Sequence, residues 1–383
     1  MKHKIVISSL CLFMLLSAGW VWQAARQQTQ KINTTPAPPI RTVPAKESDT
    51  TGKTVAAAKA LLATLDDAGR AKVNFDFNSD QKSKWSNFPT GIYQRNGLRM
   101  GDLSPVQREA VMKLLAVALS KQGLQKVKDI MEGDEALKTS GMGPGGGRGP
   151  FGGVPPNGGP PPGGGRGPGG GKLMFSRDEY YLAFLGAPSL TEPWMIQFGG
   201  HHLAINVTIA GKANVLTPSL PAAQPATYQL NGETVRPLGR EYDKGFVLIN
   251  ALDEAQLKQA VLPYQMGDMV LGAGEDGKTI QPEGIKVSAL NAAQQAKLWD
   301  VVYEWVGTLN DEAAAAKMTE IKANLNETWF AWSGSKTTGS GSYYRIQGPT
   351  VLIEFSPQRG DTTHIHTIYR DPTNDYGARL VQK

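Results

Sequence analysis

The chain has 383 residues, of which 40% are hydrophobic, so it can bury a large core and is not disordered as a whole. Its formal net charge of +6 falls to +2 once Lys2 and Lys4 of the N-terminal segment and Arg148 and Arg166 of a glycine-rich tract are set aside. Proteins that bind nucleic acid gather many Lys and Arg side chains on one face. We therefore expect no nucleic-acid partner.

The N-terminus has the pattern of a secretory leader. Lys2 and Lys4 precede an almost wholly apolar run from Ile5 to Trp22, and a polar stretch follows. We interpret residues 1–25 as a signal peptide or as an uncleaved N-terminal anchor, because about 18 apolar residues approach the minimum for a bilayer span. The alternative is a buried core helix. The leader predicts an extracytoplasmic protein, periplasmic or secreted, with membrane anchoring left open.

The single cysteine, Cys11, lies inside this leader. The residue before it is Leu10 rather than a small residue, so we expect no lipid attachment. The chain after the leader contains no cysteine and therefore offers neither a disulfide nor a thiolate ligand. Any metal site in it must be built from His, Asp or Glu side chains.

Two segments have a composition that cannot form a core. Residues 26–51 are polar and rich in Thr and Pro, which predicts a disordered tether. In residues 141–171, Gly and Pro supply 25 of the 31 positions, which predicts a disordered insert. A linker between two domains is the alternative, but the helical segment before the tract is short for an independent domain. We therefore expect a single domain over residues 52–383 that contains this insert.

Three segments share one pattern for the start of a helix, in which an apolar residue precedes a capping residue and Gln follows three positions after the cap. The cap side chain accepts from a free backbone N–H, and the Gln side chain can reach back to the cap. The caps and their Gln partners are Ser104 and Gln107, Asp253 and Gln256, and Asn291 and Gln294. Apolar periodicity predicts helices over residues 55–65, 106–119 and 311–325.

Strands are predicted by short, alternating segments rich in β-branched residues at 203–209, 351–355 and 363–369. Helices and strands follow one another without a regular βαβ rhythm. This predicts an α+β fold, a single large domain of interspersed helices and mainly antiparallel strands.

Two segments match the sequence patterns of catalytic motifs but lack the secondary structure that those motifs require. Gly272 to Thr279 fits the phosphate-loop pattern G-x4-G-K-T, but Pro282 and Gly284 prevent the helix that such a loop needs. Ser333 to Lys336 fits the S-x-x-K pattern, but its Gly- and Ser-rich surroundings prevent the helix that would place Lys beside Ser. We interpret the first as a glycine turn and the second as a flexible loop.

The histidines are the residues that indicate a possible metal site. After the leader the chain contains only His201, His202, His364 and His366, in two close pairs. Residues two apart in a strand share a face, so His364 and His366 would project together toward one metal ion. In a strand continuing through 203–209, His202 would lie on the polar face and His201 on the apolar face.

These patterns predict His202, His364 and His366 as ligands of a divalent metal ion, with His201 part of the same site in a supporting or packed position. Zn²⁺ is the expected ion, although Fe and Cu suit the same ligands. Glu354 interrupts an otherwise apolar strand and is predicted to bind the metal or to act as a general base. The alternative is that the imidazoles only form hydrogen bonds within the core.

The C-terminal segment adds charged residues beside the second histidine pair. Arg370 falls on the strand face of His364 and His366, from which it could hold an anionic group of a substrate. Asp371 or Asp375 could orient a ligating histidine. An Arg–Asp pair that closes the turn after residue 371 is the alternative.

Several of these segments resemble domain-of-unknown-function family 3500, over most of the chain from about Val55 to Gly377 apart from the insert. The histidine pairs and the terminal Asp-Tyr-Gly are the specific parts of the resemblance, which implies an exported protein and no established activity. The segments that carry it are Gly199 to His202, Trp329 to Gly334, Tyr344 to Pro349, His364 to His366, Arg370 to Pro372 and Asp375 to Gly377.

These expectations favour an exported metal-dependent enzyme, a hydrolase that acts on an unidentified small molecule or polymer through its histidine cluster. The competing hypothesis is a non-catalytic extracytoplasmic binding or structural module whose histidines are core residues.

Overall fold

The structure, a computed structural model, describes residues 49–139 and 173–381. The predicted leader, most of the predicted tether and the glycine- and proline-rich insert lie outside these residues. The first helix of the described part begins at Asp49, inside the segment 26–51 that is predicted to be a tether. In the part of the chain described, no helix is long and apolar enough to cross a membrane.

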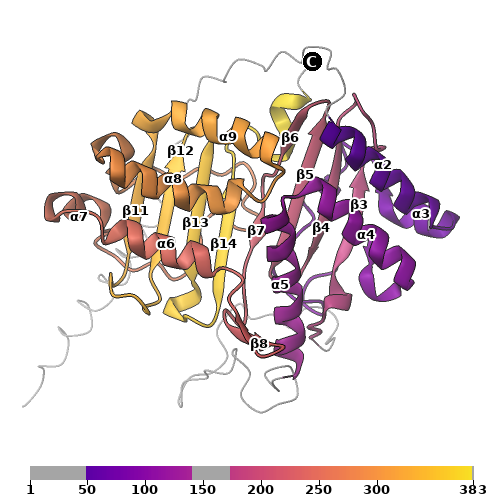
Figure 1. The fold of residues 1–383 in the computed structure, drawn as a ribbon, viewed down its shortest axis with the longest axis horizontal. Coiled ribbons are helices and arrows are strands. Elements are labelled where there is room, and N and C mark those ends of the chain that lie inside the picture. Colours follow the sequence, from indigo (N-terminus) through magenta and orange to yellow (C-terminus); the bar gives the residue numbers. More distant parts are fainter. Residues whose placement is uncertain (1–48, 140–172, 382–383) are drawn as a thin grey trace, which may run out of the picture.

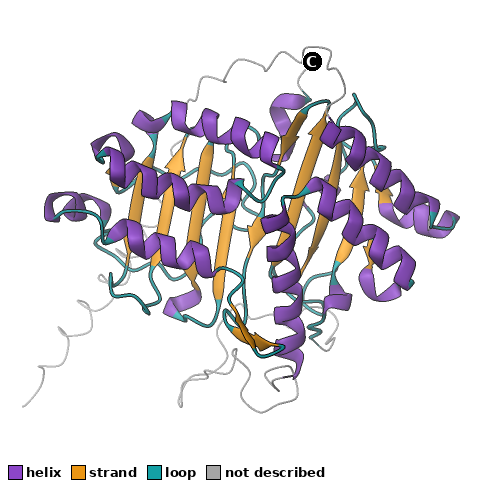
Figure 2. Ribbon diagram, viewed as in Figure 1, coloured by secondary structure: helices purple, strands orange, loops and turns teal. Residues whose placement is uncertain are grey.

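In the described residues, the first half of the chain forms a seven-stranded, mainly antiparallel sheet together with four α-helices (Figures 1 and 2). Its elements are α2 (Asp49–Ala63), α3 (Asp67–Val73), β1 (Asn74–Phe75), β2 (Leu98–Arg99), α4 (Pro105–Ala118), α5 (Lys121–Thr139), β3 (Tyr181–Leu185), β4 (Trp194–Gly200), β5 (Leu203–Ala210), β6 (Ala213–Val215) and β7 (Leu220–Pro221). Strands β3, β4 and β5 are neighbours in the sheet and in the sequence.

The second half forms a five-stranded sheet beside the first, and the long helices of both halves lie in front of the two sheets in the view of Figure 1. A small hairpin of β8 (Tyr228–Leu230) and β9 (Glu233–Val235) precedes it. Its elements are α6 (Gly239–Ile249), α7 (Glu254–Ala260), β10 (Ile285–Lys286), α8 (Ala292–Val306), α9 (Asp311–Ala323), β11 (Trp329–Ser333), β12 (Tyr343–Gly348), β13 (Val351–Pro357) and β14 (Ile365–Arg370).

The two halves repeat one order of elements: a helix pair, a long loop, a two-residue strand, a second helix pair and then consecutive antiparallel strands. Helices α3 and α7 have seven residues each and follow a capping aspartate, Asp66 or Asp253. Helices α4 and α8 both begin with a capping box. Ser104, the cap of α4, lies as many positions after Asp66 as Asn291, the cap of α8, lies after Asp253. The chain is therefore an internal repeat of one α+β unit.

A glycine at the same place in each unit supports this repeat. Gly97 and Gly284 end the long loops of residues 76–97 and 263–284, with φ angles of 107° and 94°. A Cβ atom on either would lie 2.3 Å from the carbonyl oxygen of Leu182 or 2.1 Å from that of Phe330. Only glycine fits both the backbone angle and the close approach.

One segment, residues 219–226, joins the two sheets edge to edge. Within it, β7 pairs with β5, and Ser219 and Ala223 form antiparallel bridges to β14. The backbone N–H of Ala222 donates to the carbonyl of His202 at 2.8 Å, and that of Ala223 donates to the carbonyl of Ile365 at 2.8 Å. Neighbouring residues of the segment therefore hold the two histidine-bearing stretches side by side.

The predicted α+β fold class is confirmed, with one large domain of helices and mostly antiparallel strands. All three predicted capping boxes are present. The segment before the insert is longer than expected, because α5 adds 19 residues to α4. Each unit has its own apolar core between helices and sheet, and loops cover the opposite sheet face around Leu220, Leu271 and Ile368.

Candidate metal centre

The histidine pairs meet at the junction of the two sheets. His201 and His202 form the two-residue turn between β4 and β5, while His364 lies just before β14 and His366 within it. The strand parity predicted for the first pair is wrong, because both residues belong to the turn. His202 has a φ of 59°, in the left-handed region that glycine and asparagine favour in such turns.

The strained turn directs His202 toward the second pair. Its Nε2 atom lies 3.0 Å from Nε2 of His364. One ring nitrogen from each of His202, His364 and His366 can be chosen so that all three lie within 4.8 Å of one another. The three side chains are buried, with exposed fractions of 2%, 6% and 4%. The structure therefore brings together the three predicted ligands.

His201 packs against His202, next to this group of three histidines. Its ring stacks on that of His202 with centroids 3.7 Å apart. Its Nδ1 atom lies 2.7 Å from Oδ1 of Asp134 on α5, and Tyr180 Oη lies 2.9 Å from Oδ2 of the same carboxylate. Burial raises the pKa of Asp134, while His201 and Tyr180 oppose that rise. This arrangement fits the supporting position predicted for His201, although Asp134 with His201 and His202 also forms a second compact group of possible ligand atoms.

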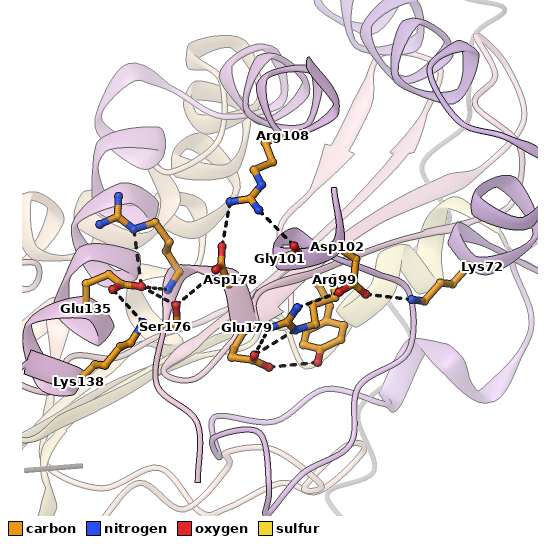
Figure 3. A network of polar contacts seen from close by, with 12 residues as sticks. Lys72, Arg99, Gly101, Asp102, Arg108, Glu135, Lys138, Ser176, Asp178 and Glu179 are labelled. Atoms are coloured by element: carbon orange, nitrogen blue, oxygen red, sulfur yellow. Dashed lines mark hydrogen bonds and ion pairs between the residues drawn. The ribbon is translucent and has the colours of Figure 1, made fainter. Parts of the chain in front are cut away.

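The position of Tyr180 depends on the polar network in Figure 3. The carboxylate of Glu135, next to Asp134 on α5, accepts from Ser176 Oγ at 2.5 Å and from the backbone N–H of Arg177 at 2.8 Å. Beside Tyr180, Glu179 accepts from Arg99 Nε at 3.0 Å. These contacts fasten residues 176–179 to α5 and to β2, and so keep Tyr180 against Asp134.

His366 is oriented by both long loops. Its Nδ1 atom lies 2.9 and 3.1 Å from the carboxylate oxygens of Asp268 in loop 263–284, and its Nε2 atom lies 3.4 Å from Nδ2 of Asn87 in loop 76–97. An Nδ1 hydrogen donated to Asp268 leaves Nε2 unprotonated, and its lone pair faces the Asn87 amide, a contact that a bound metal ion would replace. Asp268 keeps 38% of its side chain exposed, so this side of the site reaches the surface.

The surroundings of His202 and His364 favour their neutral imidazoles. Burial lowers the pKa of His202 well below its usual value, and the three neighbouring histidines lower it further. Burial, together with His366 and His201, lowers the pKa of His364 to about 3. Burial alone would raise the pKa of Asp268, but the hydrogen bonds from His366 and Met269 outweigh it and the pKa is lowered. Neutral imidazoles are the form that binds metal ions.

Glu354 lies on the same sheet face but outside this cluster. One carboxylate oxygen accepts from the N–H of Val270 at 2.9 Å and from Tyr343 Oη at 2.7 Å, and the other accepts from the N–H of Leu271 at 2.8 Å. The side chain is fully buried. These contacts fasten the loop that carries Asp268, so Glu354 positions that loop. Its predicted role as ligand or base stays a prediction.

Arg370 fastens the same loop. Its guanidinium donates to the carbonyls of Leu271 and Gly272, both at 2.7 Å, and pairs with Asp276 at 2.8 Å and Asp375 at 2.9 Å. The Arg–Asp pair that was the alternative interpretation is therefore present. The predicted hold on a substrate anion stays a prediction.

The carboxylates predicted to orient a histidine are not the ones that do so. Asp371 contacts Lys317 and Arg379, and Asp375 contacts Arg370. The histidines are oriented by Asp134 and Asp268, which lie 67 and 98 positions away from their partners in the sequence. No pattern in the sequence links them to a histidine.

The two segments that match the G-x4-G-K-T and S-x-x-K patterns lack the helix that each pattern requires, as expected. No helix follows Gly272 to Thr279; the segment contains turns, with φ of 81° at Gly274 and 72° at Gly277. Ser333 ends β11, and its Oγ donates to the carbonyl of Tyr264 at 2.7 Å. Lys336 lies in the loop that follows.

The fold and site define an internally repeated α+β protein with a buried histidine cluster between its two units. The chain belongs to the family described as "Protein of unknown function (DUF3500)", which it matches over residues 47–378. The resemblance noted from the sequence is thereby confirmed, and all four histidines, Asp134 and Asp268 lie inside the match. Comparison with curated proteins gave no match, and neither did comparison with solved structures.

Proposed function

We propose that this protein holds one divalent metal ion, Zn²⁺ in the first place, through ring nitrogens of His202, His364 and His366. The observation that carries the proposal is the convergence of three buried imidazoles from two sheets, with their nitrogens within 4.8 Å. Zn–N distances of about 2.0–2.1 Å with tetrahedral angles put two ligating nitrogens about 3.3 Å apart. The 3.0 Å between His202 and His364 is close to that value.

The partners of the cluster support a metal ion as well. A ligating histidine usually donates its other ring N–H to a carboxylate or carbonyl, and Asp268 accepts such a bond from His366. His202 lacks such an acceptor among the described residues, because its buried Nδ1 atom has no hydrogen-bond partner there. Three imidazoles also suit Fe and Cu, so the ligands alone do not select the ion.

We propose further that the centre is hydrolytic and acts on a small molecule or a polymer outside the cytoplasm. A divalent ion with three histidine ligands keeps an open position and acidifies a water molecule there. Asp268 holds His366 in the orientation for binding, and the Asp134–His201 pair fixes His202. A panel of ester, amide, phosphate and glycoside substrates tests the activity. Cleavage that stops with a chelator and returns with Zn²⁺ supports it, and no cleavage by the metal-loaded protein rejects it.

A second candidate is a non-catalytic module in which the same cluster is structural. The burial of all four histidines favours it, as does the engagement of Glu354 and Arg370 with loop 263–284. An ion bound there would join the two repeat units. Metal that raises the melting temperature of the protein while every substrate stays intact favours this candidate over the hydrolase.

The proposed location rests on the leader sequence. A reporter that is active only in the cytoplasm, joined after Thr51, should give no signal. Strong reporter activity would reject export.

A further inference from the structure

A buried arginine beside the histidine cluster forms no ion pair with any of the described carboxylates; Asp134 acts on its charge only from a distance. Arg95, in loop 76–97, is 8% exposed. Its Nη2 atom donates to the carbonyls of Ser86 at 2.7 Å, Phe88 at 2.6 Å and Gly200 at 2.8 Å. Its Nη1 atom is fully buried and has no hydrogen-bond partner among the described residues. A guanidinium stays charged at any ordinary pH, so one of its donors is left without an acceptor.

Arg95 lines a small cavity that suits an anion. The space is about 20 Å³, enough for one water molecule or one ion of similar size. Lys84 also lines the cavity, and its ammonium group forms an ion pair with Asp80 at 2.7 Å. Asn96 and Gln197 contribute amide groups, and the lining includes no Asp or Glu. Arg95, a cation without an ion pair, and the absence of a carboxylate from the lining give the cavity a positive potential.

We propose that this cavity binds a single small monovalent anion, chloride under ordinary conditions, on Nη1 of Arg95. A neutral water molecule could accept the hydrogen bond, but it would not compensate the guanidinium charge, which Asp134 offsets without forming an ion pair with Arg95. A buried charge without a contacting counterion is unfavourable in a protein interior. The ring of Tyr93, 5.3 Å from Arg95 Cζ, offsets this charge only in part. Gluconate, with its six-carbon chain, is much larger than this space and therefore serves as the comparison anion.

The anion would act on the neighbouring histidine turn through Arg95. Ser86 and Phe88 flank Asn87, whose side chain contacts His366 and whose carbonyl accepts from the backbone N–H of His202 at 3.2 Å. Gly200 directly precedes His201. Arg95 therefore ties the loop to the turn, and neutralising its charge should stabilise this part of the fold. This inference does not require that the histidines bind a metal.

Thermal melting of the metal-free protein tests the proposal. Sodium chloride should raise the melting temperature above that in sodium gluconate of equal ionic strength, by about 2–4 °C for a binding contribution of about 1 kcal/mol. Lys84→Gln should reduce the difference, and Arg95→Gln should abolish it. Arg236→Gln, which removes an exposed cation paired with Asp243, should leave it unchanged. Equal melting temperatures of the wild-type protein in the two salts would overturn the proposal.

A second measurement does not depend on the stability of the Arg95 variant. Crystals of the wild-type protein grown in sodium bromide should show an anomalous scattering peak beside Arg95 Nη1. A water molecule at that position, without anomalous signal, would overturn the proposal.

Discussion

His202 and His364 lie next to strands of different sheets and in different repeat units, yet their Nε2 atoms lie 3.0 Å apart. The contact depends on a turn in which His202 adopts a left-handed backbone, and on residues 219–226, which hold that turn beside β14. Strain of this kind costs on the order of 1–3 kcal/mol and is found mostly at functional sites. We therefore regard this pair as the centre of the site.

Asp268→Asn should weaken metal binding without removing a ligand. The amide no longer offers a charged acceptor to Nδ1 of His366, so the ring loses orientation and basicity. Loss of such a carboxylate typically lowers metal affinity by about 10–100-fold. Competition with a chromophoric chelator measures the change. Glu275→Gln on the same loop, where Glu275 pairs only with Lys278, is the control and should keep the wild-type affinity.

The metal-free protein should lose stability as the pH falls below about 6.5. His364 has a folded-state pKa of about 3, against 6.5 in the unfolded chain. Between these values the unfolded state binds more protons, so acid favours unfolding. His202, with its pKa lowered in the same direction, adds to the effect. Urea unfolding at a series of pH values measures the slope, which His364→Gln should reduce. A wild-type stability that is constant from pH 7 to pH 4 would contradict the neutral cluster.

Glu354→Gln should destabilise the fold and loosen the loop that carries Asp268. A buried carboxylate that accepts three hydrogen bonds is replaced by a group that accepts fewer and adds two donors. We expect a loss of about 1–3 kcal/mol in the free energy of unfolding. Chemical denaturation measures it, with Glu109→Gln on the exposed face of α4 as a control. If the Glu354→Gln variant keeps the wild-type stability but loses hydrolytic activity, the result would instead favour the catalytic role that the sequence predicts for Glu354.

Replacement of residues 141–171 by a short Gly-Ser linker should leave the fold intact, because the entropy of loop closure changes slowly with loop length. The melting temperature should stay within a few degrees of the wild-type value. A large decrease would show that the tract packs against the domain.

Much of the fold could be predicted from the sequence, because its signals are local. Ser104, Asp253 and Asn291 mark helix starts through contacts that reach only three residues ahead. The sequence analysis did not predict the internal repeat. The two units share the spacing of their helix caps and of glycines such as Gly97 and Gly284, but not an evident similarity in amino-acid sequence.

The site was only partly predictable. The scarcity and spacing of the histidines identified the three that converge in the structure, and the absence of cysteine after the leader limited the possible metal ligands to His, Asp and Glu. The parity argument for His201 and His202 failed because a strand pattern cannot locate a two-residue turn. Asp134, Asp268 and Arg95 could not be found, since each reaches the site through packing between distant segments.

The metal content of the purified protein tests the central claim most directly. Elemental analysis should find one divalent ion per wild-type chain after loading with Zn²⁺ and removal of the excess. Alanine at His364 or His366 should abolish it, and so should alanine at His202. His201→Ala should keep the ion and lower the melting temperature. A wild-type protein that is free of metal and takes up none of Zn²⁺, Cu²⁺ or Fe²⁺ would contradict the account.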